Sequence, residues 1–276
     1  MQKHIQQFRI KKIIAEAMMI FGAVLLILGL IGLLYEFREI ILVFAVTTGL
    51  IAILLGFSNF SSLKDNFKAD FIDDLLKTHV VNSAYDPHHG MTEKQAYDSH
   101  LLPQDKSFRA YDMVAGAIRN VAFLSSDIKI KEAEVNLFFG RLFMFEFNRP
   151  FQGETIIQPH KEKPFERVLT RRKSLEKNLP ESYQVYASNK KTVEALLDES
   201  FIKALEALNQ VHQKRVSITL ITSKVYLSIQ DLKNTFEMRL FKPLHHKELW
   251  LYAKDMALIE KLILAMRDNE KIFKTE

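Results

Sequence analysis

The residues of this chain best suited to chemistry are a carboxylate and two histidines that lie close together, Asp86, His88 and His89. Carboxylate oxygens and imidazole nitrogens bind metal ions and transfer protons. Their spacing differs from the helical i, i+4 pattern of a zinc motif such as H-E-x-x-H. The three residues therefore predict a metal or polar site only if distant parts of the fold supply further ligands, and a surface loop is the more common explanation.

A second candidate site is a run of basic residues between positions 161 and 177, mixed with glutamates. Such a run could rest on anionic lipid head groups. A solvated loop or helix face explains a mixed run more often. The candidate head-group residues are Lys161, Lys163, Arg167, Arg171, Arg172 and Lys173.

Composition excludes several kinds of site. The chain has no cysteine, which rules out disulfides, thiolate metal ligands and cysteine nucleophiles. It contains no G-x-S-x-G, Walker A or G-x-G-x-x-G motif. We therefore predict no catalytic residue, no metal and no cofactor. The net charge of +5 suits a protein beside an anionic leaflet but is too small to indicate nucleic-acid binding.

Any site must be positioned by the helices and strands of the chain. The first of these are predicted by two apolar runs, residues 17–35 and 40–63, which a charged tetrapeptide separates. At about 1.5 Å per helical residue, the first run spans roughly 28 Å, close to the roughly 30 Å of a bilayer core. The sequence predicts a transmembrane hairpin with helices at about 17–35 and 40–60. A buried hairpin in a soluble core and a cleaved signal peptide explain the two runs less well, because no polar stripe and no cleavage site is present.

Charges that flank the two runs predict the orientation of the hairpin. Lysines and arginines are enriched before the first run and after the second, whereas the tetrapeptide between them holds only Arg38 beside two glutamates. Because such residues are retained on the cytoplasmic side, both termini should be cytoplasmic, in a multi-pass protein of the inner (plasma) membrane. Neither run contains an ionisable residue, which argues against a transport pathway.

Glycines within the hairpin are spaced to lie on one face of each helix. Gly22 and Gly29 are seven residues apart, as are Gly49 and Gly56. Small residues allow membrane helices to approach closely, so these four are candidates for the contact between the two helices or between protomers. The general abundance of glycine in membrane helices is an equally good explanation.

The sequence predicts one cytoplasmic domain over residues 61–276, after the hairpin of residues 1–60. Phenylalanine occurs 21 times, and 48% of all residues are hydrophobic, which is enough for a substantial core. Amphipathic spacing predicts helices at 62–79, 191–212 and 255–268. β-forming residues predict strands at 113–119, 121–130, 135–147, 155–158, 183–186, 216–221, 224–230 and 235–241. This order indicates an α+β fold with a mainly antiparallel sheet flanked by helices.

One expected strand, residues 135–147, is apolar on both of its faces. Its phenylalanines alternate with other large apolar residues, so period two does not separate a wet face from a dry one. A central strand covered on both sides is the simplest explanation. The alternative is that the aromatic side chains line a pocket for lipid or another hydrophobic ligand.

The order of these elements resembles the bacterial domain of unknown function 3137 family. The likeness includes the hairpin, Tyr111-Asp112-Met113-Val114-Ala115-Gly116, and Tyr183-Gln184-Val185-Tyr186-Ala187-Ser188. The resemblance implies a bacterial inner-membrane protein with a cytoplasmic domain, with no assigned reaction and no active site to transfer. It also implies a LemA-type membrane protein as a partner.

Two functions from different classes remain. A membrane-anchored interaction or regulatory module that binds protein or lipid accounts for a strong anchor without a catalytic motif. A membrane-bound enzyme acting on a lipid or envelope precursor would require a pocket that contains Asp86, His88 and His89. A sensor of the lipid surface, working through the basic run, is a third and weaker hypothesis.

Overall fold

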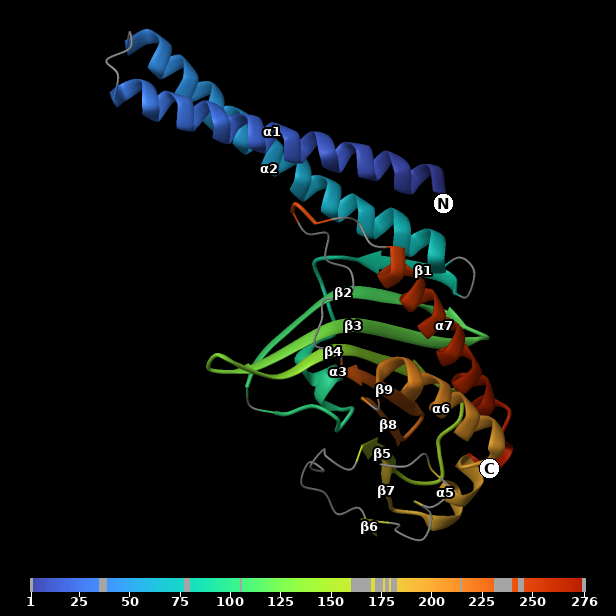
Figure 1. The fold of residues 1–276 in the computed structure, drawn as a ribbon. Coiled ribbons are helices and arrows are strands. Elements are labelled where there is room, and N and C mark those ends of the chain that lie inside the picture. The colour runs from blue at the N-terminus through green and yellow to red at the C-terminus, as the bar shows by residue number, and fades with distance from the viewer. Residues whose placement is uncertain are drawn as a thin grey trace. The chain divides into compact units, whose positions relative to one another are not determined.

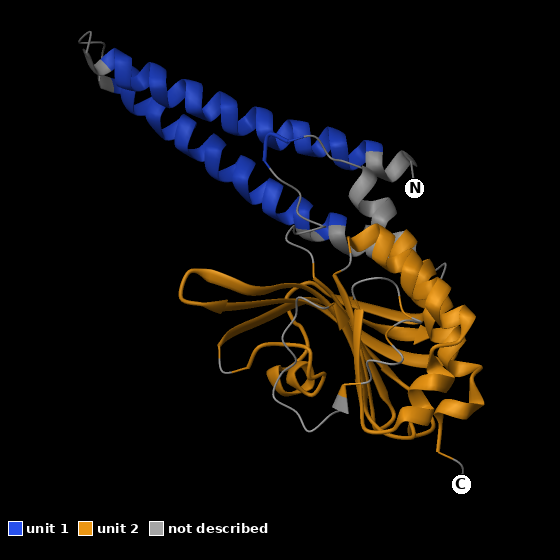
Figure 2. Cartoon of the chain, turned by 60° about the horizontal axis from the view of Figure 1, so that its bottom comes forward, with its two compact units in different colours: residues 1–74, 236–246 blue, residues 75–235, 247–276 orange. Residues whose placement is uncertain are grey.

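The structure is a computed structural model that describes residues 2–34, 39–76, 80–104, 106–159, 170–171, 176, 179, 183–213, 215–230, 240–242 and 246–274. The chain divides into two compact units, coloured separately in Figure 2. The first unit contains Met1–Asp74 and Phe236–His246, and the second contains Leu75–Thr235 and Lys247–Glu276.

The first unit is built on two long helices, α1 (Gln2–Leu34) and α2 (Glu39–Leu76). Both extend beyond the apolar runs. The helix α1 begins well before residue 17, and α2 continues through the segment for which a separate helix at 62–79 was expected. The helices are longer than the apolar runs because their polar ends also pack on each other. Lys12 of α1 is buried, pairs with Glu16 and lies over the ring of Phe60 of α2. Edge-to-face packing of Phe8 on Phe67, with ring centroids 5.1 Å apart, continues this contact.

Each helix of the first unit contains a stretch long and apolar enough to cross a membrane, residues 6–32 and 40–64. Within an apolar window of 18 residues in each stretch, only 22% of the first and 17% of the second is buried within the protein. The helix of a soluble core would be mostly buried, so this low burial disfavours that alternative. Large apolar side chains such as Phe21, Leu28, Phe44 and Leu54 are exposed.

The second unit is organised around one antiparallel sheet (Figure 1). Its strand order is β1-β2-β3-β4-β9-β8-β5-β7-β6. The strands are β1 (Val81–Asp86), β2 (Ser107–Ile118), β3 (Val121–Glu132), β4 (Val135–Glu146), β5 (Thr155–Pro159), β6 (Thr170–Arg171), β7 (Tyr183–Ala187), β8 (Val216–Ile221) and β9 (Lys224–Gln230). The predicted α+β class with an antiparallel sheet is confirmed, and the bounds predicted for β8 and β9 are the observed ones.

The helices of the second unit are α3 (Glu93–Tyr97), α5 (Lys190–Leu196), α6 (Glu199–His212), α7 (His246–Arg267) and the short 3-10 helix η1 (Glu270–Ile272). The prediction of one continuous helix over 191–212 is wrong. The carboxylate of Asp198 accepts a hydrogen bond of 2.8 Å from the backbone N–H of Phe201, which caps a new helix. The chain therefore leaves α5 at Leu197 and starts again at Glu199.

Strand β4 lies in the interior of the sheet, with β3 on one side and β9 on the other. Leu142 and Met144 face the segment that contains α3, where they join a core cluster with Met91 and Leu102. Residues of the other parity, such as Phe143, lie on the opposite face, which α5, α6 and α7 cover (Figure 1). The alternative in which a central strand is covered on both faces is therefore the one observed.

Two segments differ from expectation. The sequence of residues 82–106 predicts only turns, yet this segment contains part of β1 and all of α3. The edge strand β1 shows no period-two burial, since it is defined by pairing with β2 rather than by a dry face. Most of the strand expected at 235–241 lies outside the described residues, and Leu240 and Phe241 form a turn.

Candidate functional site

The four hairpin glycines lie where α1 and α2 approach each other. A Cβ atom built on Gly22 would lie 2.5 Å from the carbonyl oxygen of Gly49, and one built on Gly49 would lie 2.8 Å from the carbonyl oxygen of Gly22. A Cβ on Gly29 would lie 3.0 Å from Val46, and one on Gly56 would lie 2.7 Å from Met19. At Gly22, Gly49 and Gly56 an added side chain would meet backbone of the other helix, whereas at Gly29 it would meet a side chain at 3.0 Å and backbone only at 3.7 Å.

We expect Gly22→Leu to separate the two helices at this contact. The added side chain meets backbone rather than a flexible side chain, and overpacking of this kind typically costs about 1–3 kcal/mol. A disulfide can report the separation, because the Cβ built on Gly29 lies 3.7 Å from the Cβ of Ala45 and the chain has no other cysteine. The yield of the disulfide between G29C and A45C in membranes should fall several-fold.

The matched control is Ala23→Leu, a substitution one residue away on the exposed side of α1. It should leave the disulfide yield unchanged. Equal yields in Gly22→Leu and in the parent pair would show that the glycine contact does not hold the helices together.

The Asp86, His88 and His89 group forms an exposed loop between β1 and the segment before α3. One carboxylate oxygen of Asp86 accepts hydrogen bonds from the backbone N–H groups of His88 and His89, at 2.9 and 3.1 Å. Its other oxygen lies 2.7 Å from Nδ1 of His89, whose side chain is 77% exposed. These bonds, with the backbone bond from His88 first, hold the pKa of Asp86 below its ordinary value.

The geometry of this loop is that of a carboxylate capping a turn. The loop is bonded to β2 through the backbone, since Met113 donates its N–H to the carbonyl oxygen of His89 at 3.1 Å. Among the residues that the structure describes, no group of three histidine and acidic side chains could hold a metal ion. A metal or polar role for these residues stays a prediction.

Most of the basic run lies outside the described residues, namely Lys161, Lys163, Arg167, Arg172 and Lys173. Arg171 is described, and its guanidinium binds the carboxylate of Glu176 through two hydrogen bonds of 2.8 and 3.1 Å. This paired geometry raises the pKa of Arg171 above its ordinary value. A contact with lipid head groups stays a prediction for this segment.

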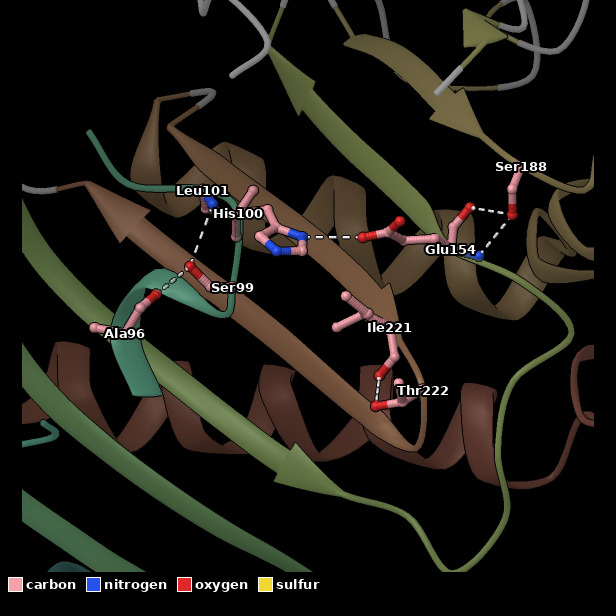
Figure 3. Close-up of polar contacts among 8 residues, drawn as sticks. All are labelled: Ala96, Ser99, His100, Leu101, Glu154, Ser188, Ile221 and Thr222. Atoms are coloured by element: carbon pink, nitrogen blue, oxygen red, sulfur yellow. Dashed lines mark hydrogen bonds and ion pairs between the residues drawn. The ribbon is translucent and has the colours of Figure 1, made fainter. Parts of the chain in front are cut away.

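The structure brings together a polar pair that sequence spacing did not indicate (Figure 3). Nδ1 of His100, which follows α3, lies 2.9 Å from Oε1 of Glu154, which precedes β5. Both side chains are mostly buried. The hydroxyl of Ser188 donates toward the carbonyl oxygen of Glu154 and accepts from its N–H, at 3.4 and 2.9 Å, which fixes the glutamate backbone. The arrangement ties the α3 segment to the start of β5.

Burial raises the pKa of Glu154, so the folded protein holds the carboxyl proton more tightly than the unfolded chain does. The bound proton contributes its full stabilisation of the fold below the ordinary glutamate pKa of about 4.3. This stabilisation is lost as the pH rises through the raised pKa of Glu154 in the folded protein. Glu154→Gln carries no charge at any pH and keeps an oxygen acceptor for His100. Its stability relative to the parent should therefore increase above about pH 4.3.

The gain should be less than about 1 kcal/mol, because solvent screens this partly exposed carboxylate. Urea unfolding of the full chain in detergent between pH 4 and pH 8 measures it. A parent protein that becomes more stable than Glu154→Gln as pH rises would show that the ionised pair stabilises the fold.

A buried polar cluster lies on the sheet face opposite α3. The hydroxyl of Tyr85 donates to the carboxylate of Asp112 at 2.6 Å, and Nε of Arg141 donates to Asp127 at 2.6 Å. Burial, followed by the bond to Asp112, raises the pKa of the Tyr85 phenol well above its ordinary value. Asp127 and Arg141 are direct cross-strand partners in the β3–β4 register, so this pair follows from strand alignment.

An open groove of about 910 Å³ runs between α6 and the C-terminal half of α7. Its apolar lining consists of Ala195, Ala204, Ala207, Leu258, Leu264 and Ala265. Its size falls in the range of 300–1,000 Å³ that is common for binding sites. Sequence reasoning identified the two helices but not this groove, because an amphipathic stripe does not reveal which helix lies beside which.

The described residues thus define a class of protein: a pair of membrane-length helices joined to an α+β unit with one antiparallel sheet. Residues 136–267 match the family model described as protein of unknown function (DUF3137). This match confirms the resemblance to that family seen in the sequence. The hairpin lies outside the match.

The comparison with solved structures finds one match, the crystal structure of the mycobacterial trehalose monomycolate transport factor A, TtfA. The likeness covers 76% of this chain and 98% of that chain, with 12% sequence identity and a TM-score of 0.48. No curated protein matches this chain.

Proposed function

We propose that this protein is an interaction or regulatory module anchored in the inner membrane. In this proposal the hairpin crosses the bilayer twice, both termini are cytoplasmic, and the α+β unit binds a protein or lipid partner near the inner leaflet. The observation that carries the proposal is the exposed apolar surface of α1 and α2, which a lipid bilayer would cover.

The features of the second unit support binding rather than catalysis. Asp86, His88 and His89 lie on an exposed loop, so the enzyme hypothesis loses its main support. Three phenylalanines of β4 are buried in a packed core, since Phe138, Phe143 and Phe145 are at 6%, 1% and 0% exposure, whereas Phe139 is half-buried. The bilayer is the first partner in this proposal, and a LemA-type membrane protein is a second.

Cysteine accessibility tests the anchor and its orientation, because the chain has no cysteine of its own. Single cysteines at Arg38, between the two apolar runs, and at Glu134, in the exposed β3–β4 turn, are treated with a membrane-impermeant maleimide. We expect Arg38→Cys to be labelled from outside the cell membrane and Glu134→Cys only after permeabilisation. Labelling of Glu134→Cys in intact cells, or release of the protein by alkaline carbonate, would contradict the proposal.

Pull-down of the full chain from solubilised membranes tests the interaction. A partner recovered reproducibly, and absent when an unrelated hairpin protein is used, supports the module. Turnover of a small molecule by the purified protein at an ordinary enzymatic rate would overturn it.

A further inference from the structure

A small pocket, called here the hairpin pocket, lies between α1 and α2 toward the polar ends of the two helices. Its volume is about 280 Å³. The buried side chains of Ala15 and Leu63 form its floor. Exposed side chains form its walls, namely Lys11 and Ile14 on α1 and Asn59, Ser62 and Asn66 on α2. The lining residues of each helix are spaced to share one face, so the pocket belongs to the seam between the helices.

Close contacts between the two helices bound the hairpin pocket on both sides. Toward the turn of the hairpin, a Cβ atom built on Gly56 would lie 2.9 Å from the carbonyl oxygen of Ala15. Toward the polar ends, Phe8 packs edge-to-face on Phe67 with ring centroids 5.1 Å apart. The helices move apart in this direction (Figure 1). The pocket is therefore a part of the helix packing and not a chance gap between side chains.

The hairpin pocket lies where the membrane-length stretches end. These stretches are residues 6–32 and 40–64, so Lys11 and Ser62 lie near the same end of both. From Asn59 to Asn66 the lining of α2 extends roughly 10 Å at the helical rise, comparable to the about 5–8 Å of head-group region on each side of a bilayer core. Leu55, one turn before Asn59, is exposed and continues the same face toward the apolar stretch. A lipid with its head group in the pocket can lay an acyl chain along this face.

Charge selects the kind of head group, because the lining of the hairpin pocket holds one cation and no carboxylate. Lys11 is exposed and has no ion-pair partner among the described residues. Its neighbour Lys12 instead pairs with Glu16. Glu16 also accepts a hydrogen bond of 2.7 Å from the N–H of Phe241, so this carboxylate is already occupied. The pocket thus offers positive charge to an anion and no negative charge to an amine.

The neutral polar groups of the hairpin pocket are hydrogen-bond donors. Asn59 and Asn66 carry side-chain amides, and Ser62 carries a hydroxyl. Within the described part of the chain, these three side chains make one hydrogen bond, a long contact of 4.0 Å from Nδ2 of Asn59 to Sδ of Met18. An ammonium beside amide and hydroxyl donors is suited to the oxygens of a phosphate and to head-group hydroxyls.

We infer that the hairpin pocket binds one anionic phospholipid of the membrane, whose head group carries hydroxyls and no amine. Lys11 binds the phosphate, and Asn59, Ser62 and Asn66 donate to the phosphate and to the head-group hydroxyls. Basic pockets between membrane helices bind anionic head groups in this way. The inference rests on the proposed function, because only a hairpin that crosses the bilayer holds this pocket at the level of the head groups.

Native mass spectrometry of the full chain in a non-ionic detergent tests the inference. Phosphatidylglycerol and phosphatidylethanolamine are added separately over a range of concentrations, and the bound fraction gives the Kd of each lipid. We expect one phosphatidylglycerol to bind per chain, at least about tenfold more tightly than phosphatidylethanolamine, because a hydrogen bond to a charged group distinguishes them. Inorganic phosphate should not displace the lipid, since it lacks the acyl chains that contribute to binding.

Substitutions separate this pocket from a general attraction between lipid and charge. Lys11→Gln should weaken the binding of phosphatidylglycerol about tenfold to a hundredfold. The matched control is Arg9→Gln, which removes the same charge from an exposed position of α1 outside the pocket and should change binding by no more than about fivefold. Ser62→Leu fills the pocket without changing the net charge and should weaken binding as strongly as Lys11→Gln. The disulfide between G29C and A45C reports that the hairpin of each variant is assembled.

Four outcomes overturn the inference: equal affinity for the two lipids, an equal loss in Lys11→Gln and Arg9→Gln, displacement by inorganic phosphate, and no bound phosphatidylglycerol. If cysteine accessibility shows that the hairpin crosses the membrane while no phosphatidylglycerol binds, the proposed function stands and the pocket is excluded. If alkaline carbonate releases the protein from membranes, both fail.

Discussion

Replacing Phe145 by alanine is expected to destabilise the second unit by about 3–5 kcal/mol. Phe145 is fully buried in β4, and its ring stacks on those of Phe123 and Phe143 with centroids 5.7 and 6.1 Å apart. Removal of the ring deletes apolar contacts on both sides and leaves a cavity that a stiff sheet cannot close. The expected loss is a large part of the 5–15 kcal/mol by which a typical domain is stable.

Pulse proteolysis of the full chain in urea and mild detergent measures this loss. The matched control is Val135→Ala at the start of the same strand, where the side chain is exposed and the change should stay within about 0.5 kcal/mol. A Phe145→Ala variant as stable as the parent would contradict the packed core that surrounds this ring.

Replacing Arg141 by methionine should cost about 3–5 kcal/mol as well. Methionine occupies similar space but leaves the carboxylate of Asp127 without the guanidinium that binds it at 2.6 Å. Both side chains of this pair are largely buried, at 12% and 9% exposure, so water replaces the lost partner poorly. The exposed Arg109→Met on β2 serves as the control and should change stability little.

A further measurement tests the cause of this loss. Combining Arg141→Met with Asp127→Asn removes the buried charge and should recover part of the stability. A cost that Asp127→Asn does not relieve would mean that the packing of Arg141 matters more than its charge.

Local sequence patterns determined much of this fold. The apolar runs predicted the two long helices because membrane-length apolar stretches require no knowledge of distant residues. The strands β8 and β9 were predicted at their observed bounds, since Thr222-Ser223 marks the turn between two β-forming segments. The break between α5 and α6 was also present in the sequence, as Asp198 is a helix N-cap, but the continuous apolar stripe obscured it.

Tertiary structure decided the features that depend on distant residues. Strand β1 exists because β2 lies beside it, and its exposed side chains carry no periodic signal. His100 and Glu154 are 54 residues apart in the chain and meet only when the α3 segment folds over the sheet. Sequence spacing placed Gly22 and Gly29 on one face of a helix, whereas the fold set Gly22 directly against Gly49.

The candidate sites also depended partly on the sequence and partly on the tertiary structure. The sequence singled out Asp86, His88 and His89 by residue type, and the fold turned Asp86 into the cap of an exposed loop. The groove arises because α6 and α7 lie side by side, with Lys261 and Lys271 at its edge. Sequence by itself determined the class of fold and most of the helices and strands, because short-range periodicity controls them. Only the tertiary structure decided which surfaces lie together, since packing between distant elements has no local signal.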